Sequence, residues 1–166
     1  FQTGNFAALS FFGSWFSRDF HLTTSGIGSA MIAIGAGNAV GSLFGYRLVA
    51  KWGTPRSLVI GILAMAAGYA GVAFTQSLIP AICLLTFVML AAGFLFPVLM
   101  TTLQSNAGTN RGTVSSLTNV AMYAGTTIGA GIAGPLFNAT PQFTGIAALT
   151  ITGYLIALLL FTRVSR

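Results

Sequence analysis

The chain has 166 residues, of which only eight are charged, seven basic and one acidic, while 55% are hydrophobic. Because roughly a quarter of the residues in a soluble domain are charged, this composition excludes a water-exposed surface over the whole molecule. The basic residues are scattered over several short segments, which excludes the contiguous basic patch of a nucleic-acid-binding protein. The composition therefore predicts an integral membrane protein whose first partner is the lipid bilayer.

Six apolar stretches follow one another along the chain, and crossing a bilayer takes about 20 residues. Such runs are longer than buried strands and lack the alternation of a membrane β-barrel. We therefore expect an all-α membrane protein, a polytopic helical bundle of about five full transmembrane helices and one truncated helix. Since the chain begins inside a span, we expect a fragment of a longer protein. The expected spans are 1–16 (partial), 26–49, 57–75, 79–103, 113–136 and 143–162.

The charges are distributed unequally between the two ends of these spans. Threading the connections alternately across the membrane puts six basic residues on one side and one on the other. Since cytoplasmic loops carry the excess of Lys and Arg, the first side is expected to be cytoplasmic, together with the C-terminus. We expect the membrane to be a bacterial inner (plasma) membrane. The first set is Arg47, Lys51, Arg56, Arg111, Arg163 and Arg166; the second is Arg18, next to the acid Asp19.

Glycines recur at helical spacing in two of the spans. The second span has glycine at every fourth position, and the fifth repeats the spacing once. Glycine on one helix face lets another backbone approach closely in lipid, so we expect these faces to form packing or gate contacts. The residues are Gly37, Gly41, Gly45, Gly125 and Gly129. In the fourth span, Pro97 removes one helical hydrogen bond and predicts a kink.

Polar side chains at membrane depth are costly and are therefore candidates for substrate contact. The polar candidates are Asn5, Asn38, Asn119 and Tyr123, and the aromatic wall candidates are Phe87, Phe94 and Phe96. The alternative for each polar residue is an interhelical hydrogen bond that only holds the bundle together. The alternative for each phenylalanine is simple packing in a lipid-facing helix.

Catalytic and metal-binding patterns are sparse. The single cysteine, Cys83, lies in an apolar run, and the single histidine, His21, lies beside Asp19 in an outer loop. No full span contains Asp, Glu, Lys or His, whereas an intramembrane enzyme needs a nucleophile with a base, or paired acids, at depth. We therefore expect no enzyme, no cofactor and no metal site.

The basic turn after the second span carries a family resemblance. Residues 48–56 resemble the loop motif of the major facilitator superfamily, usually written G-x-L-x-D-R-x-G-R-R. Leu48, Lys51 and Gly53 occupy the Leu, first basic and second Gly positions, and Arg56 ends the basic turn. Two positions depart from the motif, with tyrosine at residue 46 for the first Gly and alanine at residue 50 for the Asp. Such decay is typical of the copy in the family's C-terminal half.

A second segment, 110–129, is similar to the penultimate helix of drug:proton antiporter-type members. The resemblance implies the C-terminal six-helix half of a secondary transporter that works by alternating access, with efflux of drug-like or other small amphiphilic compounds. It implies three partners: the N-terminal half, a small-molecule substrate and, in coupled transport, a proton. It also implies that the first and fourth helices line the cavity, the second and fifth face the other half, and the third and sixth face lipid.

Two alternatives to this function stay open from the residues. One is a self-sufficient half-sized carrier that acts as a dimer. The other is a structural or sensory membrane subunit, since close-packed glycines serve any helical bundle.

Overall fold

The structure is a computed structural model, and it describes residues 2–164 except for the side chains of residues 2, 3, 48, 162 and 164. Arg166 and the side chain of Leu48 therefore lie outside the described part. The described residues form six helices: α1 (Gln2–Phe20), α2 (Thr24–Trp52), α3 (Thr54–Ala73), α4 (Leu78–Ser105), α5 (Arg111–Ala139) and α6 (Thr144–Val164). All but α1 are long and apolar enough to cross a membrane. The expected all-α membrane bundle is confirmed.

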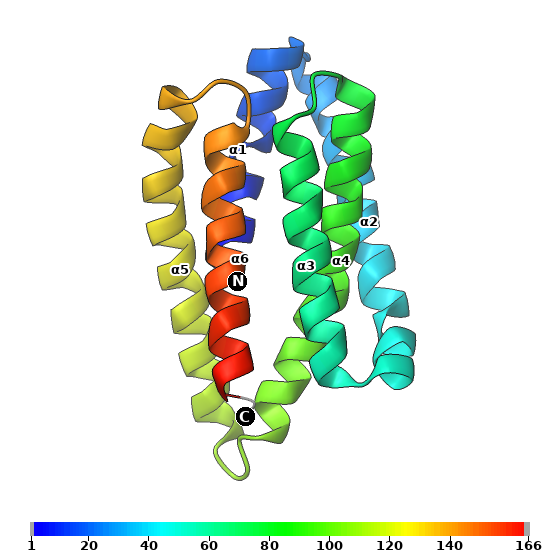
Figure 1. The fold of residues 1–166 in the computed structure, drawn as a ribbon, viewed down its shortest axis with the longest axis vertical. Helices are drawn as coiled ribbons and strands as arrows, with labels where there is room; N and C mark the ends of the chain where they lie inside the picture. Colours follow the sequence, from blue (N-terminus) through cyan, green and yellow to red (C-terminus); the bar gives the residue numbers. More distant parts are fainter. Residues whose placement is uncertain (1, 165–166) are drawn as a thin grey trace.

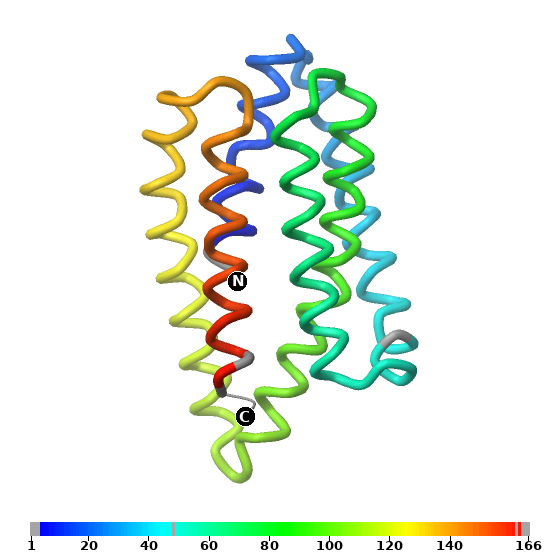
Figure 2. Tube along the Cα trace, viewed as in Figure 1, coloured from blue at the N-terminus to red at the C-terminus, as the bar shows by residue number. Residues whose placement is uncertain are grey.

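The helices run alternately up and down. The α1–α2, α3–α4 and α5–α6 connections lie at one end of the bundle, and the α2–α3 and α4–α5 connections lie at the other (Figure 1). We call these the outer and inner ends. Helix α1 starts about halfway between them (Figure 2), which matches the truncated first span. The last part of α4 leans away from α2 towards α5, in agreement with the kink expected at Pro97, which lies inside this helix.

Local chemistry sets the ends of α2. Thr23 is its N-cap, and the hydroxyl Oγ1 accepts a bond from the backbone N–H of Gly26 at 3.3 Å. Gly53 ends the helix at a φ of +77°, a conformation that glycine adopts without a Cβ clash. Helix α3 begins at the next residue. Lys51 and Arg56, expected in a loop, therefore lie on the last turn of α2 and the first turn of α3.

The six helices form two groups of three. Helices α2, α3 and α4 pack together, as do α1, α5 and α6, and the pair α3 and α6 joins the groups along one side (Figure 1). Aromatic rings hold the second group together. The ring centres of Trp15 on α1 and Phe143 before α6 lie 4.8 Å apart, and those of Phe11 on α1 and Phe137 on α5 lie 5.2 Å apart. We call the boundary between the two groups the seam.

The glycine face of α2 packs against α4 of the same chain. A Cβ on Gly41 would overlap the backbone carbonyl of Leu90, and one on Gly93 of α4 would overlap the backbone carbonyl of Asn38. Gly37 meets the backbone carbonyl of Thr86 in the same way, whereas a Cβ on Gly45 would overlap the side chain of Phe94. These glycines therefore let two helices of this chain pack closely, and the gate role expected for the same face stays a prediction. In α5, Gly129 is buried and Gly125 is half-buried.

Candidate functional site

A cavity of about 210 Å³ lies at the seam, and we call it the seam cavity. Four helices contribute to its wall: α1, α2, α4 and α5. Most of the lining is apolar, with two amides and one hydroxyl among it. The lining residues are Asn5, Phe6, Asn38, Ser42, Ala92, Gly93, Phe96 and Met122. The structure thus brings the sequence candidates Asn5, Asn38 and Phe96 together.

Asn5 also reaches behind the cavity. Its amide oxygen Oδ1 accepts hydrogen bonds from the hydroxyl of Tyr69 on α3 at 3.3 Å and from the hydroxyl of Tyr154 on α6 at 3.5 Å. Both tyrosines are fully buried, and Asn5 itself is 9% exposed. One side chain of α1 therefore links both helix groups through α3 and α6.

Asn38 and Ser42 fasten α2 to α4 beside the cavity. The amide Nδ2 of Asn38 donates to the carbonyl oxygen of Met89 at 3.3 Å, and the hydroxyl of Ser42 donates to the carbonyl of Gly93 at 3.1 Å. The interhelical hydrogen bond that was the alternative for Asn38 is therefore formed. The same residue also lines the seam cavity, so contact between Asn38 and a substrate stays a prediction beside this bond.

Other sequence candidates lie elsewhere. Asn119 is exposed, and Tyr123 is 73% exposed; Met122, between them, is the α5 residue that lines the seam cavity. Phe87 is also exposed and lies beside Gly68 of α3. Polarity alone could not single out Met122, although it lies one helical turn after Asn119 and so shares its face.

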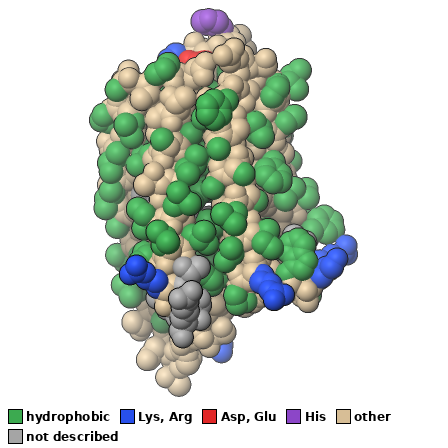
Figure 3. Space-filling view, in the orientation of Figure 1, with side chains coloured by type: hydrophobic (Ala, Val, Ile, Leu, Met, Phe, Trp, Pro, Cys, Tyr) green, Lys and Arg blue, Asp and Glu red, His purple; other side chains and the backbone are tan. Residues whose placement is uncertain are grey.

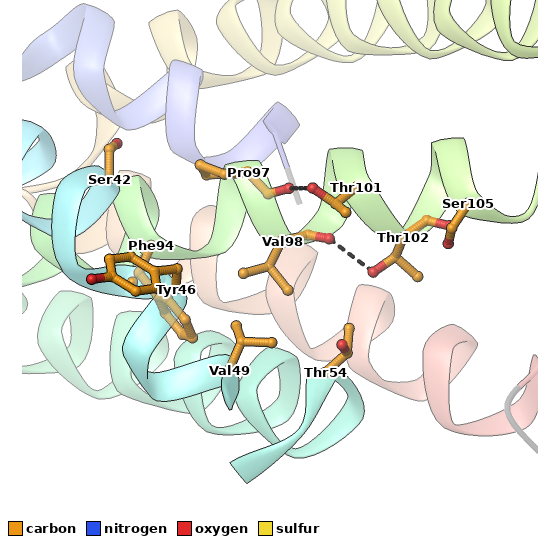
Figure 4. Close-up of a pocket in the computed structure, with 11 residues that line it drawn as sticks. Ser42, Tyr46, Val49, Thr54, Phe94, Pro97, Val98, Thr101, Thr102 and Ser105 are labelled. Carbon is orange, nitrogen blue, oxygen red and sulfur yellow. Dashed lines mark hydrogen bonds between the residues drawn. The ribbon is translucent and has the colours of Figure 1, made fainter. Parts of the chain in front are cut away.

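A groove of about 310 Å³ lies nearer the inner end, between α2, α4 and the start of α3 (Figure 4). Phe94 belongs to this groove, where its ring packs on Gly45, and Tyr46 lines it at the position where the loop motif has glycine. The hydroxyls of Thr101 and Thr102 each donate to a carbonyl one turn earlier at 2.8 Å. The groove is therefore apolar with internally bonded hydroxyls.

The outer end is held by Arg18. Its guanidinium donates to Asp19 Oδ1 at 2.7 Å, to the carbonyl of Phe137 at 2.8 Å and to the carbonyl of Gln142, and it lies 3.9 Å from the centre of the Phe137 ring. The other oxygen of Asp19 accepts from the indole N–H of Trp15 at 2.9 Å. These contacts fix the end of α1 on the turn between α5 and α6.

The charged side chains separate in space as the sequence predicts. In Figure 3 the histidine and the acid lie at the outer end, and most of the visible Lys and Arg lie at the inner end. Lys51 and Arg56 are both exposed there. Among the described residues, no three His, Cys, Asp or Glu side chains come close enough to hold a metal ion. The lining of the seam cavity offers amide and hydroxyl hydrogen bonds and apolar contact, which is the chemistry of a binding site.

Comparisons with known proteins agree with this architecture. The chain matches the family described as "Major Facilitator Superfamily" over residues 1–166. It is 44% identical over 168 residues to YceJ, an uncharacterized MFS-type transporter of Bacillus subtilis (strain 168). That alignment covers the whole of this chain and 43% of the relative, so the chain spans less than half of the relative's length. No solved structure matches the chain. The chain therefore belongs to the major facilitator superfamily.

Proposed function

We propose that this chain is the C-terminal half of a secondary active transporter that exports small, amphiphilic molecules by alternating access. The observation that carries the proposal is the seam cavity. Its wall combines the amides of Asn5 and Asn38 with the apolar side chains of Phe6, Phe96 and Met122. An amphiphilic molecule finds both apolar contact and a few hydrogen bonds in such a wall.

The proposed partner is an N-terminal half, which the length of the relative accommodates. The expected spans here contain no Asp, Glu, Lys or His. Because a proton pathway needs a titratable group at depth or a substrate that carries the proton, we place proton coupling in that other half. Transport by residues 1–166 alone, reconstituted in vesicles, would instead favour the half-sized carrier that acts as a dimer.

Cysteine labelling tests whether the seam cavity is an aqueous binding site. In the full-length protein with Cys83→Ser, we expect Phe96→Cys to react with a membrane-impermeant maleimide and Phe87→Cys to react at least tenfold more slowly. Phe96 is 37% exposed and lines the cavity, whereas Phe87 is 47% exposed and lies beside α3. Phe87 has the larger exposed fraction of the two. Faster labelling at Phe96→Cys would therefore reflect access to water and not the exposed fraction of the side chain.

A transported amphiphile is expected to slow labelling at Phe96→Cys and to leave Phe87→Cys unchanged. Labelling is measured as the rate of maleimide incorporation in membrane vesicles at rising concentrations of a lipophilic cationic dye and of a neutral dye. Equal rates at the two positions, or no protection by any dye that the transporter removes from cells, would contradict a substrate cavity at the seam.

Sidedness is tested in the same background. We expect His21→Cys to be labelled in intact cells and Lys51→Cys to be labelled only after the membrane is opened. Five of the six basic residues expected in the cytoplasm lie in the described part of the chain. Because an excess of Lys and Arg keeps one side of a membrane protein in the cytoplasm, the inner end with Lys51 should be protected in intact cells. The reverse pattern would put the inner end outside and overturn the proposed direction of the bundle.

A further inference from the structure

Two buried tyrosines behind the seam cavity have no part in the function proposed above. We propose that Tyr69 and Tyr154 fix the orientation of the Asn5 amide so that its NH2 group faces the seam cavity, and that this donor selects uncharged substrates carrying a carbonyl or ether oxygen. The inference rests on the proposed function and deepens it, because it names the class of substrate and the residues that set the preference.

The first step concerns which end of the amide faces the tyrosines. A phenol has one proton to donate, and an amide offers one oxygen that accepts and one nitrogen that only donates. Tyr69 and Tyr154 both reach Oδ1 of Asn5, at 3.3 and 3.5 Å. The carbonyl oxygen can accept from both phenols at once, since it has two lone pairs. The proton of Tyr69 at 3.3 Å, with the hydroxyl of Tyr154 beside it at 3.5 Å, therefore holds the oxygen towards α3 and α6.

The second step concerns the other end of the same amide. Asn5 lines the seam cavity, and with Oδ1 held at the back, Nδ2 is the end of the amide that is left for the cavity. Its neighbours in the wall include the apolar side chains of Phe6 and Phe96, beside the polar side chains of Asn38 and Ser42. A substrate oxygen in the cavity is an acceptor that this donor can use.

The third step separates positioning from contact. The side chains of Tyr69 and Tyr154 are fully buried and are not among the residues that line the seam cavity, so a molecule in the cavity does not touch them. They act through Asn5 and are positioning residues. A donor that is already fixed loses little freedom when the substrate binds, so it discriminates between substrates better than a rotating amide.

The fourth step gives the expected selectivity. A neutral hydrogen bond in a protein contributes a net factor of roughly 2 to 12 in affinity. A ligand that fills the cavity without an acceptor leaves the Asn5 donor unpaired and loses this factor. We therefore expect about a fivefold to tenfold preference for a ketone over the hydrocarbon of the same shape.

The test uses the purified full-length transporter in detergent and two probes. One is 6-propionyl-2-(dimethylamino)naphthalene, an uncharged ketone whose emission shifts to the red when its oxygen accepts a hydrogen bond. The other is the 6-propyl analogue, which lacks the oxygen. In the parent protein we expect the ketone to bind about fivefold to tenfold more tightly. In the variant with Tyr69→Phe and Tyr154→Phe, we expect the ratio to approach one and the ketone emission to shift to the blue.

Control variants separate positioning from a general loss of structure. Asn5→Leu is expected to abolish the preference, because it removes the donor. Tyr123→Phe, on exposed α5 surface, is expected to change neither value. The single variants Tyr69→Phe and Tyr154→Phe, each lowering the ratio part-way, serve if the double variant does not fold.

Three results would overturn the inference. A ketone preference unchanged in the folded tyrosine variants removes the positioning role, and one unchanged in Asn5→Leu removes the donor. Failure of the parent to bind either probe removes the class of substrate. These outcomes are distinct from failure of the proposed function, which shows instead as equal maleimide labelling rates at Phe96→Cys and Phe87→Cys.

Discussion

Replacing Gly41 with leucine is expected to prevent stable packing of α2 on α4. A Cβ at this position overlaps the backbone carbonyl of Leu90, and a backbone atom cannot swing aside as a side chain can. The two helices must separate, which opens their contact over several turns and breaks the Ser42–Gly93 hydrogen bond. We expect a loss of at least about 3 kcal/mol of folding free energy, at the upper end of what overpacking costs. Thermal unfolding of the full-length protein in detergent measures it.

Gly35 provides the matched control on the same helix. Nothing in the described part of the chain lies within 4 Å of a Cβ built there. Gly35→Leu therefore introduces the same side chain without the clash, and the unfolding temperature should stay close to that of the parent. If Gly41→Leu and Gly35→Leu unfold at the same temperature, the backbone contact between α2 and α4 is not formed as described.

Replacing Arg18 with alanine is expected to release the outer end of α1 from the turn between α5 and α6. The variant loses two charge-assisted hydrogen bonds to the carbonyls of Phe137 and Gln142 and the contact with the Phe137 ring. Hydrogen bonds to charged groups contribute about 1.5–3 kcal/mol each when buried, but this side chain is 36% exposed. We therefore expect a total loss of about 2 kcal/mol, measured as a lower unfolding temperature.

Two further variants give this prediction its controls. Arg18→Lys should recover little of the loss, because an ammonium lacks the planar fork that reaches two carbonyls while lying over a ring. Arg47→Ala removes a similar side chain whose contacts, with Phe44 and Tyr46, stay within its own helix. It should leave the unfolding temperature almost unchanged. A larger effect at Arg47 than at Arg18 would contradict the anchoring role of Arg18.

The helical bundle could be predicted because lipid imposes a simple rule on sequence: every span must be a long apolar run. Apolarity says less about where a helix ends. The run-based ranges 26–49 and 57–75 leave a loop of several residues, but the structure has only Gly53 between α2 and α3. Backbone hydrogen bonds, not hydropathy, decide that boundary, and they continue through the charged residues Lys51 and Arg56.

The candidate site was partly predictable for a related reason. Asn5 and Asn38 stand out because an amide at membrane depth is costly, and both line the seam cavity. Tyr69 and Tyr154 were missed, since a tyrosine in an apolar run gives the same signal as any packed aromatic ring. Their meeting at Asn5 depends on how α1, α3 and α6 are rotated about their axes. The spacing of residues within one helix does not contain that information.

The partner of the glycine face was unpredictable on similar grounds. Spacing of four residues shows that another backbone approaches, but many helices can supply it. In the structure α4 supplies that backbone next to Gly41, and Gly93 of α4 in turn packs against the backbone of α2.

The backbone contact between α2 and α4 constrains how this bundle can change shape. Where side chains interdigitate, helices slide past each other by small shear steps, each absorbed by a change of rotamer. Here the carbonyls of Leu90 and Asn38 fit against glycines, so axial sliding would drive them into the neighbouring residues. Helices α2 and α4 must therefore move together as one rigid body. Any rearrangement inside this bundle falls on the seam, where the two groups of helices can hinge about the Asn5 side chain.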